Sequence, residues 1–388
     1  MYLWGLNMKL LHTSDWHLGM TFSGGISYKE DQEFAIQKIC EIAVNEKVDG
    51  ILLAGDVFDK SIASHDALDT YNAVITYICT TLNIPVYIIA GNHDGADRIS
   101  QLRELLKKSG LFICGALEEK PYVVSLNDTD IFLLPWISTD KVKSIYPQEA
   151  ESIKTMEDAY KVVLDHYRDE FKPNKKNILV AHAYIVDAET SVSDKAAEIG
   201  TATKVSASVF DGFDYVALGH LHGPQMINDH IRYSGTPMAY SFGREENQEK
   251  SVVIIDTDTM EQKVVAIPQL RKRLTIKGKY KEIFDKEYPR DILDAYIRLE
   301  LTDTFVTLET IASFREKFTN LLEVSGKSLE KEDVKITMTV DELERVVTDP
   351  VEVFVRYCQD SIGEAPTEHI VNLFKDAVEK YEKEEINQ

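Results

Sequence analysis

Five short apolar runs in this chain each end in side chains that can bind a metal ion or transfer a proton. They are KLLHTSDWH (9–17), GILLAGD (50–56), YIIAGNHD (87–94), NILVAH (177–182) and YVALGHLH (215–222). Continuous apolar runs of this length are typical of strands buried on both faces of an α/β sheet. Because the carboxyl ends of parallel strands open onto one crevice, we expect the polar residues after these runs to meet there.

Segments with helical periodicity separate the first three runs. In 33–44 and 68–82 the apolar residues recur with a period near 3.6. The order strand, helix, strand, helix favours right-handed βαβ units, so we predict an α/β fold. The chain has 388 residues, of which 44% are hydrophobic, so it can bury a sizeable core in two or three domains.

The sequence pattern changes after Tyr233, from alternating strands and helices to a hairpin and a basic segment. Residues 250–268 have the pattern of a β-hairpin, and RKRLTIKGKYK (271–281) contains six basic residues and no acidic one. Further on, a strand (295–301), a helix (308–322) and a strand (334–340) predict a small α+β domain. We therefore divide the chain into a main domain (8–268), an α+β capping domain (269–340) and a tail (341–388).

The tail has 13 acidic and 5 basic residues and two helical patterns, 349–360 and 367–384. Six apolar residues would form stripes on these helices: Phe354, Tyr357, Ile370, Leu373, Phe374 and Val378. Such stripes either dock into a groove of a partner protein or cap the chain's own small domain. The sequence pattern leaves both readings open.

Charge and cysteine usage limit the classes of partner. The formal net charge of −22 and the pI near 4.9 argue against broad attraction to nucleic acid or anionic membrane, although a single cleft can differ. The four cysteines, Cys40, Cys79, Cys114 and Cys358, form no C-x-x-C pair, and residues 1–7 are too short for a signal peptide. No apolar stretch reaches the roughly 18 residues of a membrane span. We expect a cytoplasmic protein.

Seven side chains at the run ends form a candidate metal centre. One ion cannot use seven ligands and leave room for a substrate, whereas two ions can, if a carboxylate bridges them about 3.5–4 Å apart. Nitrogen and oxygen donors without cysteine suit Mn²⁺, Fe²⁺ or Zn²⁺. The candidate ligands are Asp15, His17, Asp56, Asn92, His182, His220 and His222.

Taken singly, each motif has a simpler structural explanation. A D-x-H pair arises by chance, G-D is usually a turn, and a histidine at a strand end is usually a hydrogen-bonded residue. The rarer G-N-H-D could cap a helix through Asn92 or Asp94. The metal site is favoured because five of the ten histidines fall at the ends of apolar runs.

The ordered set SDWH, GD, GNHD, AH and GHLH resembles the calcineurin-like metallophosphoesterases. More narrowly, SDWHLG, EDQ (30–32), LLAGDVFD, IAGNHD, ALGHLHGPQ and YSGTPMAYSFG resemble the branch of this family that processes DNA ends. The likeness runs from Met8 to about Phe242 and continues more loosely to the end of the chain. It implies a core of two packed mixed β-sheets flanked by helices, with a small α+β cap and a helical tail.

The resemblance also implies roles for the candidate residues. Asp15, His17 and His222 would hold one metal ion. Asn92, His182 and His220 would hold the other, with Asp56 between the two. His93 would be the catalytic acid, and the ions would be two divalent cations such as Mn²⁺. Some relatives have a histidine three residues after the bridging aspartate, where this chain has Asp59, so the role of that histidine is not carried over.

The activity implied is that of a two-metal DNA nuclease. In this branch it comprises a 3′–5′ double-strand exonuclease and a single-strand or hairpin endonuclease that act with a coiled-coil ATPase in DNA repair, recombination and replication. The tail would bind that ATPase. The apolar faces of 68–82 and 98–106 would form a homodimer within a heterotetramer, unless they are ordinary core helices. Five basic residues are candidates for DNA contacts: Arg98, Arg244, Arg271, Lys272 and Arg273.

The same candidate site is compatible with functions other than DNA cleavage. The same site would serve a small-molecule phosphodiesterase or phosphatase, such as a cyclic-nucleotide hydrolase, which needs neither a second domain nor an apolar tail. A non-enzymatic scaffold would be expected to have lost ligands, whereas all seven are present. A periplasmic nucleotidase is disfavoured because no secretory signal is found.

Overall fold

The computed structural model describes residues 8–22, 26–186, 188–191, 194, 204–327, 337–339, 351, 354–355, 366 and 370–375. It divides into two compact units. The first comprises Met1–Met20 and Ser27–Arg273, and the second comprises Thr21–Ile26 and Leu274–Gln388. Most of the two helices expected in the tail, 349–360 and 367–384, lies outside the described residues, as do residues 1–7.

The first unit contains a six-stranded sheet in the order β16-β15-β1-β4-β5-β6. Four of its strands run parallel, and they are β1 (Lys9–Thr13), β4 (Gly50–Ala54), β5 (Val86–Ile89) and β6 (Leu111–Cys114). At one edge, β15 (Ser251–Asp256) and β16 (Gln262–Ala266) form an antiparallel pair. The parallel βαβ arrangement and the hairpin predicted in 250–268 are both confirmed.

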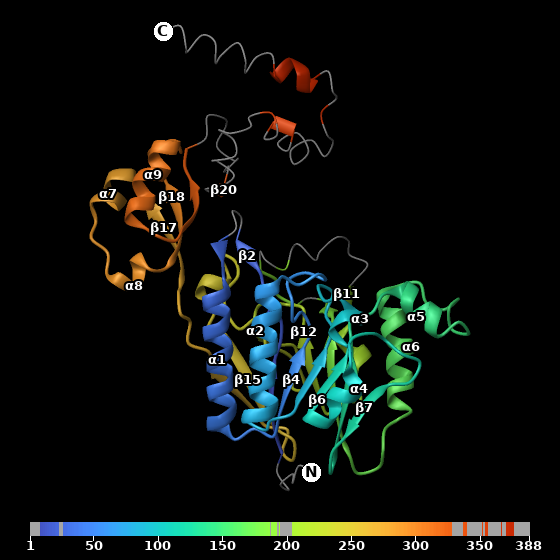
Figure 1. Ribbon diagram of the computed structural model, residues 1–388. Coiled ribbons are helices and arrows are strands. Elements are labelled where there is room, and N and C mark those ends of the chain that lie inside the picture. The colour runs from blue at the N-terminus through green and yellow to red at the C-terminus, as the bar shows by residue number, and fades with distance from the viewer. Residues whose placement is uncertain are drawn as a thin grey trace, which may run out of the picture. The chain divides into compact units, whose positions relative to one another are not determined.

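Two helices, α1 (Lys29–Glu46) and α2 (His65–Thr76), lie side by side in Figure 1. Their apolar residues, among them Ile39 and Ile75, pack with the strands of this sheet in one core. A short π-helix, Tyr77–Thr81, extends α2. The segment 98–106, expected to present one helical face, is instead divided into α3 (Ala96–Ile99) and α4 (Arg103–Leu106), because Leu102 between them has a left-handed φ of 59°.

A second six-stranded sheet has the order β13-β14-β12-β9-β8-β7. Its strands are β7 (Tyr122–Ser125), β8 (Thr129–Leu134), β9 (Lys176–His182), β12 (Tyr215–Gly219), β13 (Gln225–Met226) and β14 (Ile231–Tyr233). Helices α5 (Thr139–Ile145) and α6 (Met156–Arg168) precede β9, and α6 packs on this sheet through residues such as Tyr160 and Leu164. Two short strands, β10 (Tyr184–Ile185) and β11 (Lys204–Val205), pair nearby.

The two sheets pack face to face through a shared apolar layer. Leu10, Leu52 and Ile89 of the first sheet belong to one buried cluster with Ile178 and Ala217 of the second. With helices on the outer faces, this is the mixed two-sheet core expected for the fold. The carboxyl ends of the central strands of both sheets therefore meet at one edge, where the sequence places the candidate ligands.

The second unit contains a four-stranded sheet in the order β17-β18-β19-β20. The strands are β17 (Arg273–Gly278), β18 (Tyr296–Leu301), β19 (Leu321–Ser325) and β20 (Thr337–Thr339), and a separate two-stranded sheet joins β2 (Thr21–Phe22) to β3 (Ile26–Ser27). Between residues 274 and 327, the helices of this unit are α7 (Tyr280–Asp285), α8 (Arg290–Leu293) and α9 (Leu308–Lys317).

The expected strand at 295–301 is confirmed, but the helix predicted over 308–322 is too long. Helix α9 begins after Thr307, whose hydroxyl accepts a hydrogen bond from the Thr310 amide, and it ends at Lys317. Leu321 and Leu322 belong to β19, where both are buried. In this segment, pairing of β19 with β18 overrides the helical period of the sequence.

Candidate metal centre

The loops after β1 and β4 run side by side and are joined by backbone hydrogen bonds. The Asp15 amide donates to the Gly55 carbonyl at 3.0 Å, and the His17 amide donates to the Asp56 carbonyl at 2.9 Å. The loop after β5 joins them, because the His93 amide donates to Asp56 Oδ1 at 2.9 Å. Three loops that are far apart in the sequence thus hold their polar side chains in one place.

Four of the candidate ligands have backbone conformations that residues other than glycine rarely adopt. Asp15 has φ 53°, His17 has φ 44°, Asp56 has φ 49° and His220 has φ 105°. Positive φ at a residue with a side chain costs free energy and persists only where the surroundings impose it. Here the sharp bend after each strand turns the side chain toward the same crevice.

The two sheets are in close contact at this edge. A Cβ atom on Gly219 would lie 1.8 Å from the Ala54 carbonyl oxygen, so only glycine fits at the end of β12. The same carbonyl lies 2.9 Å from His182 Nδ1, and because a carbonyl can only accept, Nδ1 carries the proton. The Nε2 atom of His182 is therefore the one that faces Asn92 and Asp56.

One group of side chains converges around His17 and His222. Their Nε2 atoms lie 3.2 Å apart, and His17 Nε2 lies 3.8 Å from Asp56 Oδ2. Two nitrogen atoms that each lie about 2.1 Å from a shared ion in tetrahedral geometry would be separated from each other by a distance close to that between these two Nε2 atoms. Nδ1 of His17 is buried without a hydrogen-bond partner among the described residues. The Asp15 carboxylate, buried beside this group, accepts hydrogen bonds from Ser14 Oγ and the His220 amide.

A second group converges around Asn92. Its Oδ1 lies 3.0 Å from His182 Nε2 and 3.1 Å from His220 Nδ1. Asp56 Oδ2 lies 3.3 Å from His182 Nε2, so a single carboxylate oxygen is close to both groups. All seven candidate ligands predicted from the sequence are thus gathered at the junction of the two sheets.

The electrostatics suit cation binding. Burial lowers the pKa of His17 well below its ordinary value and lowers that of His220 to about 3, which keeps both imidazoles in the neutral form that ligates metals. Burial raises the pKa of Asp15 to about 6. Burial alone would also raise the pKa of Asp56, but His182 and the other nearby imidazoles outweigh it and hold the pKa below its usual range. Burial alone would lower the pKa of His182, but Asp56 and Asp15 outweigh it and raise the pKa to about 9, so a cation that binds His182 must displace a proton from it.

These observations fit two divalent cations. Carboxylate and imidazole ligands are buried together, and the half-buried Asn92 amide lies against two of the imidazoles. Ligand atoms of Asp15, Asp56 and His182 lie within 4.8 Å of one another. Two buried carboxylates this close together are unfavourable unless they coordinate a cation or pair with a positive group.

His93 lies at the wall of this centre. Its Nδ1 is 2.8 Å from the Asp59 carbonyl oxygen, so that Nδ1 donates and Nε2 is the atom left for chemistry. The ring is 4.9 Å from the His17 ring. Ligand atoms of Asp59, His17 and His93 lie within 4.8 Å of one another, which places the Asp59 carboxylate at the centre as well.

Two buried residues that hold the loops in place were not assigned these roles from the sequence. Gln32, in the EDQ string, donates through Nε2 to the His17 carbonyl at 2.7 Å and to the Tyr240 hydroxyl at 3.0 Å. Asp94 does not cap a helix, because its carboxylate accepts from the amides of Gly91, Val57 and Phe58. The only signals in the sequence were the EDQ and GNHD strings themselves.

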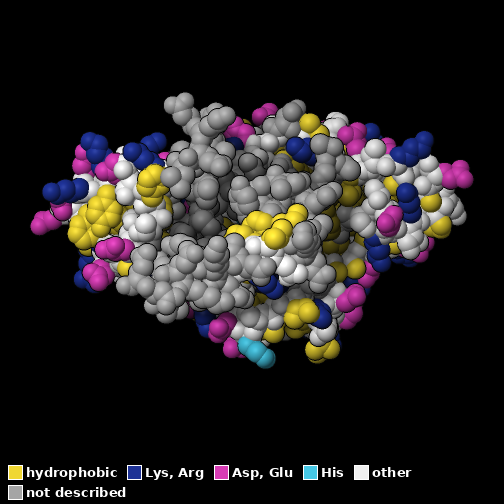
Figure 2. All heavy atoms as spheres, turned by 90° about the horizontal axis from the view of Figure 1, so that it is seen from above, with side chains coloured by type: hydrophobic (Ala, Val, Ile, Leu, Met, Phe, Trp, Pro, Cys, Tyr) yellow, Lys and Arg dark blue, Asp and Glu magenta, His cyan; other side chains and the backbone are white. Residues whose placement is uncertain are grey.

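The residues proposed for DNA contacts are mostly engaged elsewhere. Among the described residues, Figure 2 shows basic and acidic side chains interspersed around one face of the molecule, not gathered by sign. Arg271 pairs with Glu30 and Asp31, and Arg244 pairs with Glu189.

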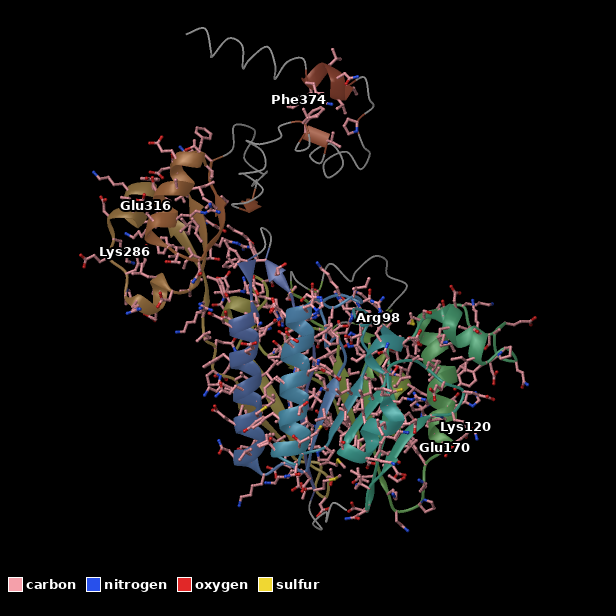
Figure 3. The ribbon with its side chains drawn as sticks, viewed as in Figure 1. Arg98, Lys120, Glu170, Lys286, Glu316 and Phe374 are labelled. Atoms are coloured by element: carbon pink, nitrogen blue, oxygen red, sulfur yellow. The ribbon has the colours of Figure 1, made fainter. Side chains whose placement is uncertain are left out.

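Arg273 does not fit the expectation of a DNA contact, because it is only 3% exposed. Its Nε donates to the Ala239 carbonyl, and its guanidinium lies over the rings of Tyr28 and Phe242. Arg98, labelled in Figure 3, and Lys272 are exposed and remain candidates.

Comparison with known proteins identifies the family. A family model described as calcineurin-like phosphoesterase matches residues 8–224. The D subunit of the nuclease SbcCD from Staphylococcus epidermidis is 31% identical over 323 residues, which cover 82% of this chain and 85% of that protein.

Two solved structures are more distant. TT1561 of Thermus thermophilus is 12% identical over 67% of this chain and 99% of its own, with a TM-score of 0.38. GAP50, the anchor in the inner membrane complex of Plasmodium, is 13% identical over 68% of this chain and 89% of its own, also with a TM-score of 0.38.

The chain belongs to the calcineurin-like phosphoesterases, and it is a metal-dependent hydrolase of phosphate esters. Within this family it groups with SbcD, the D component of the SbcCD nuclease. Both levels of the resemblance drawn from its sequence motifs are thereby confirmed.

Proposed function

We propose that this protein is a two-metal-dependent DNA nuclease that acts with an SbcC-type coiled-coil ATPase on DNA ends and hairpins in the cytoplasm. The observation that carries the proposal is the convergence of seven potential ligands from five strand ends at one sheet edge. The name and 31% identity of the S. epidermidis relative support the choice of DNA as substrate. The activities proposed are a 3′–5′ exonuclease on duplex ends and an endonuclease on single strands and hairpins, in DNA repair, recombination and replication.

The geometry supports a division of the ligands between two ions. The facing Nε2 atoms of His17 and His222 suit one ion. Asp15 is assigned to the same ion from the family resemblance, and its carboxylate lies within 4.8 Å of ligand atoms of Asp56 and His182. Asn92 Oδ1, which faces both His182 and His220, suits the other. Asp56 is proposed to bridge them, because its Oδ2 is near imidazoles of both groups. The donor set is compatible with Mn²⁺.

In such a site, two divalent cations neutralise the charge of the phosphodiester and make a hydroxide nucleophile available near neutral pH. The role proposed for His93 is to protonate the leaving oxygen through Nε2. Its Nδ1–H is anchored on the Asp59 carbonyl, and its amide is held by Asp56, so the ring is oriented before substrate binds. Proton transfer by an oriented side chain contributes roughly 10²–10⁴-fold to the rate.

The partner is proposed to bind the tail. Ile370 and Leu373 are 44% and 57% exposed, and Phe374, labelled in Figure 3, stacks on Phe354 with ring centroids 4.2 Å apart. Exposed apolar residues on an amphipathic segment suit a groove on another protein. Since Arg244, Arg271 and Arg273 are engaged within this chain, the ATPase is expected to supply further DNA contacts.

A homodimer is proposed to form through the surface around α2, α3 and α4. Ile62, Leu102 and Leu105 are 71%, 73% and 61% exposed there. Ile62 lines a groove of about 470 Å³ together with Leu68, Tyr71 and Leu106. A contiguous apolar surface of this kind is typical of protein interfaces. With the ATPase, the dimer would make a heterotetramer.

The proposal is tested by incubating the purified protein and Mn²⁺ with end-labelled blunt duplex, labelled hairpin DNA and cyclic nucleotides, with and without the ATPase. We expect cleavage of DNA, shortening from 3′ ends and opening of hairpins, and none of it after addition of EDTA. The His93→Gln variant controls for contaminating nucleases. Hydrolysis of cyclic nucleotides without cleavage of DNA would instead identify a small-molecule phosphodiesterase.

A further inference from the structure

A fully buried ion pair lies directly behind His222. Lys250, immediately before β15, and Glu245 have side chains that are 1% and 0% exposed, and Lys250 Nζ lies 2.8 Å from Glu245 Oε2. The ammonium also donates to the Thr236 hydroxyl and to the His222 carbonyl, both at 2.9 Å. All three N–H groups of the lysine are therefore satisfied, and one of them holds the backbone of a candidate ligand.

The Glu245 carboxylate ties the same region together. Its Oε2 accepts from the Tyr240 amide at 3.0 Å, while its Oε1 lies 4.0 Å from His222 Nδ1. Asp194 approaches the imidazole too, with Oδ1 3.8 Å from Nδ1 and 2.9 Å from the His222 amide nitrogen. The Nδ1 edge of His222 thus faces two carboxylates, and its Nε2 edge faces His17.

The second ring nitrogen of a metal-binding histidine commonly points to a carboxylate or carbonyl, which fixes the ring and strengthens it as a ligand. His182 has the Ala54 carbonyl in that place, at hydrogen-bond distance. For His222 the two carboxylate oxygens lie 3.8 and 4.0 Å from Nδ1, beyond hydrogen-bond distance, so they act on the ring by charge. The direct hold on this residue is the 2.9 Å hydrogen bond from the buried Lys250 ammonium to the His222 carbonyl.

Stability of the fold is a poor explanation for the pair. Removing two charges from water is costly, and replacing a buried ion pair by apolar side chains of similar size is often neutral or stabilising. Buried ion pairs are better known for imposing one conformation on their surroundings than for adding stability. Here the residue whose conformation is imposed is His222.

We propose that Lys250 and Glu245 are positioning residues that hold His222 in the orientation required to bind the metal ion that it shares with His17. The proposal rests on the ligand assignment made under the proposed function. Neither residue touches the reacting atoms. Loss of the pair should weaken one of the two metal sites and leave the site of Asn92, His182 and His220 intact.

The test compares Mn²⁺ binding by full-length wild type, Lys250→Met and the double variant Glu245→Leu/Lys250→Met. Calorimetric titration gives the affinity and number of ions, and electron paramagnetic resonance distinguishes a coupled ion pair from an isolated ion. We expect one site in each variant to bind roughly 10–100-fold more weakly, the range typical of such outer partners, and the coupled signal to be lost at limiting Mn²⁺.

The double variant separates positioning from folding. Lys250→Met leaves Glu245 buried without its partner and can lower stability, whereas the double variant removes both charges. Asp130→Asn, which disrupts a different ion pair with Lys172 and Lys175, is the matched control and should bind both ions normally. Wild-type affinity for both ions in the double variant would overturn the proposal. Ion binding is measured without DNA, so it does not depend on nuclease activity. If the wild type binds two ions but does not cleave DNA, the nuclease assignment is wrong and the positioning proposal is unaffected.

Discussion

At the residue scale, the candidate metal centre is built from residues whose backbones are strained. Asp15, His17, Asp56 and His220 all have positive φ, and strain of this kind costs on the order of 1–3 kcal/mol per residue. The two buried carboxylates of Asp15 and Asp56 add a desolvation cost when no cation is present. The centre therefore reduces the stability of the metal-free fold, and a bound ion recovers part of it.

Metal binding should accordingly stabilise the protein against heat. An ion that binds the folded state at a concentration 100 times its Kd raises the free energy of unfolding by about 2.7 kcal/mol. We expect Mn²⁺ to raise the Tm of the EDTA-treated protein, measured by differential scanning calorimetry. The Asp56→Asn variant should show a smaller rise, and an unchanged Tm for the wild type on adding Mn²⁺ would contradict the prediction.

His93→Gln should separate metal binding from catalysis. Glutamine can still donate to the Asp59 carbonyl but cannot protonate a leaving group, so we expect hydrolysis to fall by roughly 10²–10⁴-fold while two ions remain bound. Metal analysis and turnover of a simple phosphodiester give the two readouts. If the variant turns over at close to the wild-type rate, His93 is not the acid.

At the scale of elements, Gly219 controls how closely the two sheets meet. A methyl group at this position would collide with the Ala54 carbonyl, so Gly219→Ala must push β12 away from β4 and carry His220 with it. Overpacking of this kind costs roughly 1–3 kcal/mol, and we expect weaker Mn²⁺ binding as well. Chemical denaturation and calorimetric titration measure both effects.

Gly278→Ala is the control for that change, because its added methyl would meet Ile283 at an ordinary contact distance of 3.4 Å. It should leave metal affinity unaltered. Normal metal affinity in Gly219→Ala would show that the sheets can separate without disturbing the centre.

A second element-scale prediction concerns pH. The Asp130 side chain in β8 is 0% exposed and accepts hydrogen bonds from Lys175 at 2.6 Å and Lys172 at 3.1 Å. Burial raises the pKa of Asp130, but the bonds from Lys175, Ser125 and Lys172 outweigh it, so its pKa is below the usual 3.8. A lowered folded-state pKa adds stability above pH 3.8, which is lost as the pH falls through the folded value.

Asp130→Asn should therefore lower the free energy of unfolding by roughly 1–3 kcal/mol at about pH 7. The difference from the wild type should shrink below pH 3.8, the ordinary pKa of the group. Urea denaturation at several pH values measures it. Asp165→Asn, at a side chain that is 75% exposed, should change stability little, and a pH-independent difference for Asp130→Asn would refute the electrostatic origin.

The sequence predicted the strands and the gathering of the candidate ligands because both depend on local signals. Each buried strand is a continuous apolar run, and each ligand follows directly at its end. The division of 98–106 at Leu102 was missed, since its left-handed φ has no signature in a leucine. The end of α9 was missed because pairing of β19 with β18 is a long-range contact. The ion pair of Lys250 with Glu245 depends on three-dimensional packing around His222, which periodicity cannot reveal.

At the scale of the whole molecule, the chain combines a phosphoesterase unit with a smaller α+β unit and an acidic tail. In the described part of the chain, no helix has the length and hydrophobicity to span a bilayer. Cys40, Cys79 and Cys114 are free and buried, and burial raises the pKa of the Cys114 thiol to about 12, so these thiols are inert packing groups.

Deletion of residues 342–388 should separate the hydrolytic centre from partner binding. All seven candidate ligands lie before residue 223, so the truncated protein should hydrolyse a simple phosphodiester at a rate close to wild type. We expect it to lose co-purification with the ATPase in a pull-down assay. Continued co-purification would show that the partner binds elsewhere and would leave the tail as a cap for the small domain.

If the seven side chains enclose a pair of cations, anomalous diffraction from crystals soaked in Mn²⁺ will locate both ions. We expect two peaks about 3.5–4 Å apart, both in contact with Asp56. One peak should lie beside His17 and His222, and the other beside Asn92, His182 and His220. A single peak, or none between Asp56 and His182, would contradict this expectation.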